Sequence, residues 1–79
     1  MKLVLVRWLD AVSDETGWKP LAKLRKQKPP LVRSVGWVVK QERGYLTLAA
    51  SLVGEDADGD VTIPMGMIRS VETLAVKKP

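Results

Sequence analysis

Residues 45–53 place the strongest constraint on the fold, because their side chains alternate strictly between two kinds. One set of alternate positions holds Leu46, Leu48, Ala50 and Leu52, and the other holds Tyr45, Thr47, Ala49 and Ser51. Successive side chains of a β-strand point to opposite faces, so a period of two is typical of a strand with one buried face. The segment therefore predicts a strand whose Leu46 face lines a core.

Three further segments have the composition of short strands, namely residues 2–9, 31–40 and 61–63. The first carries apolar residues on both faces, Leu3, Leu5 and Leu9 against Val4, Val6 and Trp8, so we expect it to be buried on both sides. Gly36, inside the second, predicts a bulge or a sharp bend. A tight turn over 42–44 joins that strand to the next in an antiparallel hairpin.

The segment between the first two strands is long and mostly polar. Pro20 is well placed to begin a helix, and the two prolines at 29–30 end it. Leu21 and Leu24 share one face of that helix. At most two turns fit, and a helix this short is not stable alone, so we expect its leucine face to dock on something.

Residues 65–75 fit two descriptions. The helical one rests on apolar residues at every third position, at Ile68, Val71 and Leu74. We favour a 3₁₀ turn over 64–67 followed by a bulged strand over 68–76. The whole chain, residues 1–79, is then predicted to be one domain and mostly β. Its expected architecture is a small five-stranded SH3-like or Sm-like barrel with one short helical turn in the loop after strand 1.

The chain contains no cysteine and no histidine, which excludes disulfides and any catalysis that needs a thiol or an imidazole. We expect no enzyme activity and no cofactor. Asp56, Asp58 and Asp60 alternate as they do at the start of a calcium loop, but Val61 stands where such a loop needs glycine. Residues 54–60 are therefore expected to be a solvated hairpin loop with a central Asp-Gly turn, and no metal site is expected.

The net charge of +4 is unevenly distributed, because residues 19–28 hold five basic side chains and no acidic one. The candidate partner-binding residues are Trp18, Lys19, Lys23, Arg25, Lys26 and Lys28. Such a cluster suits a phosphate-bearing partner, on whose bases Trp18 would stack. It is also the ordinary composition of a solvated helix face. Trp18 itself is either a lid on the core or an exposed anchor, and we favour the lid. A groove of Trp and Tyr side chains would alternatively take a proline-rich peptide.

Five segments carry a resemblance to known proteins: VRWLD at 6–10, GW at 17–18, SVGWVV at 34–39, LTLA at 46–49 and IPMGMI at 63–68. In order and spacing they resemble small accessory proteins encoded by tailed bacteriophages and prophages. That group has no assigned activity, so the resemblance supplies no functional residues. It implies a protein made in the cytoplasm of an infected bacterium.

The leading hypothesis is a non-enzymatic, phage-encoded binding module that docks on a host or phage protein. One alternative is nucleic-acid binding through residues 19–28, and a second is a minor structural or assembly component of the virion. Homo-oligomerisation would supplement the thin core of so short a chain. We expect a cytoplasmic protein without a membrane segment, because Arg7 interrupts the N-terminal apolar run and no run approaches a membrane span.

Overall fold

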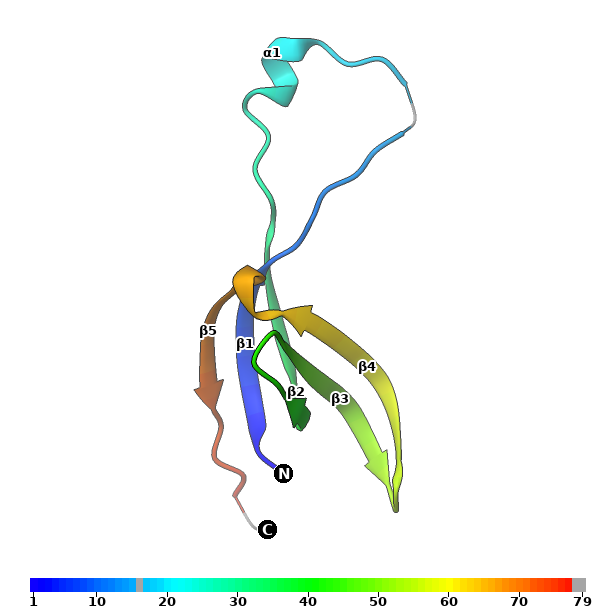
Figure 1. Ribbon diagram of the computed structural model, residues 1–79, viewed down its shortest axis with the longest axis vertical. Coiled ribbons are helices and arrows are strands. Elements are labelled where there is room, and N and C mark those ends of the chain that lie inside the picture. The colour runs from blue at the N-terminus through cyan, green and yellow to red at the C-terminus, as the bar shows by residue number, and fades with distance from the viewer. Residues whose placement is uncertain (16, 78–79) are drawn as a thin grey trace.

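The computed structural model describes residues 1–15 and 17–77, and the chain is mostly β with little helix (Figure 1). Its elements are β1 (Leu3–Leu9), α1 (Leu21–Leu24), β2 (Leu31–Gln41), β3 (Tyr45–Val53), β4 (Asp56–Pro64), the 3₁₀ helix η1 (Met65–Met67) and β5 (Ile68–Thr73). The five strands form one antiparallel sheet in the order β4-β3-β2-β1-β5. Five antiparallel strands, with one helical turn in the loop after the first, confirm the mostly β part of the sequence-based expectation, whereas the expected barrel is not confirmed.

The two edges of the sheet are β4 and β5, which do not pair with each other within the described residues, so the sheet is not closed. η1 connects them across one end of the sheet (Figure 1). The sheet curls strongly enough for β1, β3 and β4 to share one core. That core is a cluster of five fully buried side chains: Val4, Val6, Leu46, Leu48 and Ile63. Partly buried methionines of η1 pack against it.

The alternation in β3 buries the side chains that it predicts, but only along the first half of the strand. Leu46 and Leu48 are each 2% exposed, whereas Leu52 is 38% exposed. From Ala50 to Asp60 every residue is exposed. The β3–β4 hairpin therefore leaves the core at Ala50 and continues outward as a two-stranded ribbon.

β2 pairs with β1 along its first part and with β3 along its last part, and Gly36 lies next to the residue where the pairing changes. Trp37, beside it, pairs with Leu3 of β1 and with Ala49 of β3. A Cβ atom at Gly36 would lie 3.0 Å from the Ala49 carbonyl oxygen and 3.1 Å from the Leu48 Cβ. Glycine thus permits the close approach of β3. The β2–β3 register shifts between Val38 and Lys40, so β2 carries an irregularity of the expected kind two residues beyond Gly36.

The expectation that the first strand is buried on both sides is wrong. Val4 and Val6 face the core, whereas Leu3, Leu5 and Leu9 on the other face are only partly buried. No second layer of the described chain covers that face, because all five strands belong to one sheet. The apolar residues of the outer face are therefore only partly shielded from solvent.

The expected loop over 54–60 is also wrong. The turn consists of Gly54 and Glu55 alone, and β4 begins at Asp56, which pairs with Val53. Gly54 has a φ of 57°, the left-handed conformation that a two-residue hairpin turn needs. Gly59, where the Asp-Gly turn was expected, lies within β4. Pairing with β3 overrides the weak strand preference of the aspartates.

Residues 65–75 adopt the favoured alternative, with η1 followed by β5. The β5–β1 register shifts between Arg7 and Trp8, so the last strand is bulged as expected. It ends at Thr73, shorter than the expected 68–76. Within the described residues, neither helix has the length that a membrane crossing requires.

Candidate functional site

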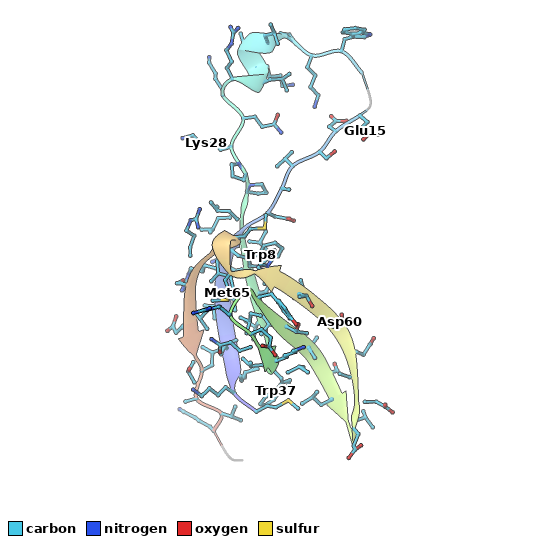
Figure 2. The ribbon with its side chains drawn as sticks, in the orientation of Figure 1. Trp8, Glu15, Lys28, Trp37, Asp60 and Met65 are labelled. Carbon is cyan, nitrogen blue, oxygen red and sulfur yellow. The ribbon has the colours of Figure 1, made fainter. Side chains whose placement is uncertain are left out.

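The loop between β1 and β2, residues 10–30, projects away from the sheet and carries all six candidate partner-binding residues (Figure 1). Its base is closed by a hydrogen bond of 3.1 Å that the Asp10 amide donates to the Pro30 carbonyl. Figure 2 shows Glu15 and Lys28 on the two limbs of this projecting loop, with Trp8 near its base. The molecule is consequently elongated, with extents of 52 × 29 × 23 Å.

The limb of the loop that returns to β2 contains α1. The local sequence explains why this helix is short. The Pro20 carbonyl accepts hydrogen bonds from the amides of Lys23 and Leu24, at 3.1 and 3.3 Å. The Arg25 amide donates to the Leu21 carbonyl at 2.9 Å, which completes the single turn. Proline at 29 and 30 then prevents continuation.

The apolar side chains of the projecting loop are exposed. Trp18 is 104% exposed, Leu21 65% and Leu24 42%. The interpretation of Trp18 as a lid on the core is therefore wrong. The leucine face of the helix, which was expected to dock on something, is exposed and does not dock within the described chain. The loop extends away from the sheet, and the core is covered by Trp8 and η1.

The basic side chains of the projecting loop fall into two groups. Lys19 forms an ion pair with Asp14 of the outgoing limb. Lys23, Arg25, Lys26 and Lys28 are exposed and form no ion pair with any residue in the described part of the chain. Four cationic groups thus follow the exposed Trp18 within ten residues of the chain.

The arrangement offers a contact surface with an aromatic anchor, two leucines and several cations. Within residues 1–15 and 17–77 no polar or charged side chain is buried. Exposed Leu21 and Leu24 belong to this surface but are absent from the six predicted residues, because the sequence did not indicate which surface their shared face would contact. The length of the connection carried the missing signal, since irregular loops beyond about 12–15 residues in compact domains are usually functional or disordered.

The aspartates singled out as the start of a calcium loop lie instead along β4. Asp56, Asp58 and Asp60 pair with Val53, Ser51 and Ala49. In the described residues, no three acidic side chains come together in a way that would hold a metal ion.

Two hollows lie outside the projecting loop. One, of about 320 Å³, opens into the curl of the sheet and is lined in part by Val38, Met65 and Val71. The other, of about 120 Å³, lies at the outer end of the β3–β4 hairpin. Neither is lined by any of the six candidate residues.

Comparison of this chain with family models, curated proteins and solved structures finds no match in any of the three.

Proposed function

We propose that this protein is a non-enzymatic, phage-encoded binding module that docks on a host or phage protein through its projecting loop. The observation that carries the proposal is the full exposure of Trp18 on a loop that leaves the fold. A tryptophan side chain that stays in water gains none of the favourable free energy that burial of its large apolar surface would give. Docking on a partner supplies that burial.

The chemistry of the loop indicates the kind of protein partner that would fit. Tryptophan is enriched among interface hot spots, whose truncation costs about 2 kcal/mol or more, or roughly thirtyfold in affinity. Leu21 and Leu24 extend the apolar contact along one face of α1. The unpaired cations at Lys23 and Lys26 favour carboxylates around it. The partner surface is thus an apolar groove with an acidic rim.

We also propose that the sheet is an open version of an SH3-like or Sm-like barrel. Three features support this: a long loop after β1, the 3₁₀ helix η1 before β5, and the order β4-β3-β2-β1-β5. The shared core of β1, β3 and β4 shows how far the sheet has already curled. On such a scaffold, loops rather than strands are the expected place for binding.

Nucleic-acid binding through residues 19–28 is the second candidate. The observation that favours it is a fully exposed Trp18 in the same projecting loop as four cations that have no carboxylate partner in the described chain. An exposed indole stacks on unpaired bases, and the cations would release counterions from phosphates. The exposed leucines of α1 favour the protein partner, because phosphates and bases provide little apolar surface against which leucine side chains can be buried.

The test compares three forms of the full chain on a solid support: wild type, Trp18→Ala with Leu21→Ser, and the matched control Val35→Thr. Val35 is 57% exposed on β2, outside the loop. Each captures proteins from nuclease-treated bacterial lysate, with and without phage infection. Captured proteins are identified by mass spectrometry, purified and titrated. The proposal expects one protein bound by wild type and control and at least about thirtyfold more weakly by the loop variant.

Absence of any protein whose binding depends on Trp18 would overturn the proposal. The nucleic-acid candidate is tested in parallel by fluorescence anisotropy of labelled single- and double-stranded oligonucleotides. Contacts to two or three phosphates predict affinity at least about tenfold weaker at 200 mM than at 50 mM salt. No binding at 50 mM salt would exclude that candidate.

A further inference from the structure

We infer that the outer end of the β3–β4 hairpin is a second docking surface, and that its occupant is the projecting loop of another copy of this chain. The inference rests on the proposed role of the projecting loop as a docking element. It adds a self-association that the proposed function does not require. Three observations carry it: an apolar hollow at the hairpin end, complementary charge, and the distance between the two surfaces.

The hairpin end offers a small apolar recess in an exposed ribbon. The hollow of about 120 Å³ is lined by Ser51, Val53, Asp56, Ala57 and Asp58. Val53 is 78% exposed, although valine is an apolar residue. Two-stranded ribbons are marginally stable when nothing covers them. An apolar group seated in this recess would bury Val53 and stabilise the ribbon.

The recess is surrounded by carboxylates without cationic partners. Glu55, Asp56, Asp58 and Asp60 form no ion pair with any other described residue. No lysine or arginine occurs between residues 44 and 68. The projecting loop has the opposite character, with an exposed tryptophan followed by a basic limb. The acidic residues of the projecting loop, Asp10, Asp14 and Glu15, all precede Trp18, so its segment 18–28 combines apolar side chains with positive charge only, and the hairpin end combines them with negative charge only.

The two surfaces cannot neutralise each other within one molecule. They lie at opposite ends of a chain whose longest extent is 52 Å (Figure 1). At physiological salt, charges are screened beyond about 8 Å, so the ends of one copy are electrostatically independent. Between copies the two ends can meet. We therefore place Trp18 of one copy against Val53 of the next, with Lys23 and Lys26 facing Asp56 and Asp58.

A contact between two different surfaces is heterologous, so a pair of copies joined by one such contact still presents one free projecting loop and one free hairpin end. Successive copies then form an open chain or, if the rotation closes, a ring. Assembly is expected to grow with protein concentration and to weaken with salt, because unlike charges face each other in an exposed contact.

The test measures the mass of the full chain by sedimentation velocity from about 10 μM to 1 mM, at 50 and 500 mM salt. Wild type is expected to associate, with affinity at least about tenfold weaker at the higher salt. The loop variant Lys23→Glu with Lys26→Glu and the hairpin variant Asp56→Lys with Asp58→Lys are each expected to remain monomeric. An equimolar mixture of the two variants is expected to associate again, because every contact regains opposite charges.

The matched control is Lys2→Glu with Arg43→Glu, which reverses two exposed charges outside both surfaces and is expected to associate like wild type. Wild type that stays monomeric at 1 mM and 50 mM salt overturns the inference. So does association that survives either charge reversal, or a mixture that fails to associate. If circular dichroism shows that a charge-reversal variant does not fold, the inference is tested instead by whether Trp18→Ala loses association and by the salt dependence of wild-type association. Capture of another protein that depends on Trp18 leaves the proposed function standing whichever result is found.

Discussion

The Trp8 indole donates a hydrogen bond of 3.0 Å from Nε1 to the Ser34 Oγ, linking β1 and β2 on the core side of the sheet. Trp8 pairs with Val32 and Ser34 with Val6, so the bond runs diagonally between neighbouring register positions. The indole thereby keeps its polar atom satisfied while its ring packs against the buried cluster.

Removal of this acceptor is expected to destabilise the fold. Ser34→Ala leaves the partly buried Trp8 donor without its partner and lowers the free energy of unfolding by about 1 kcal/mol. Urea denaturation measures the change. Ser51→Ala, at an exposed position, serves as the control and is expected to change stability by less than about 0.5 kcal/mol. Equal effects at both positions would contradict the assignment.

A side chain at Gly36 is expected to disturb the crossing of β2 and β3. The added Cβ of Gly36→Ala would lie 3.0 Å from the Ala49 carbonyl oxygen, on backbone that cannot rotate away. Overpacking of this kind costs about 1–3 kcal/mol. Gly44→Ala is the matched control, because nothing lies within 4 Å of its added Cβ. Thermal or urea unfolding compares the two variants, and equal stability would count against the close approach.

Truncation of the core at Leu48 is expected to cost far more than truncation further along the same face. Leu48 is 2% exposed, and its replacement by alanine costs about 2–5 kcal/mol. Leu52→Ala, at a position 38% exposed, is expected to lose under about 1 kcal/mol. If Leu48→Ala does not fold, Ile63→Val, at a position 0% exposed, is expected to lose about 0.5–1.5 kcal/mol. Comparable losses from Leu48→Ala and Leu52→Ala would contradict the observed core.

Trp18 is expected to contribute binding surface and no folding energy. Because its side chain is fully exposed, Trp18→Ala should leave the free energy of unfolding within about 0.5 kcal/mol of wild type. The same variant should lose the component of tryptophan fluorescence that acrylamide quenches most readily, since Trp8 and Trp37 are partly buried. A stability loss above about 1 kcal/mol would restore the lid interpretation.

The ammonium of Lys40 is expected to titrate above its ordinary range. It lies 5.3 Å from the centre of the Tyr45 ring. The hydrogen bond and charge interaction with Tyr45, with a smaller contribution from Glu42, raise the pKa of Lys40. A raised folded-state pKa means that the stabilisation is complete below the unfolded pKa and is lost as the pH rises through the folded value. NMR titration should show a lower pKa for Lys40 in Tyr45→Phe than in wild type. A smaller change is expected in Glu42→Gln.

Much of the strand pattern was predictable because it depends on neighbours in sequence. The alternation over 45–53 identified β3 and its buried leucines, and the composition of 65–75 was enough to favour η1 and β5 over a helix. The start of β4 was not predictable in the same way. Asp56 is a poor strand former and joins the sheet through pairing with Val53, whose position depends on the turn.

The candidate site was also predictable only in part. The types of residue in the loop, one tryptophan, two leucines and five cations between residues 18 and 28, were readable from the chain. Their exposure was not, because sequence spacing does not tell whether an apolar side chain has a surface within reach. The sheet curls round its own core and the loop extends away from it. No part of the sheet therefore covers Trp18, which is exposed to solvent.

By itself, the sequence determined most of the extended segments, the place of the helical turn in the loop after β1, and which catalytic residue types the chain lacks, because backbone preference and chemical inventory are local properties. Only the tertiary structure decided that the sheet stays open, that the outer face of β1 is uncovered and that basic and acidic surfaces lie at opposite ends. These features arise from contacts between residues far apart in the chain, and the balance of burial over all five strands sets them.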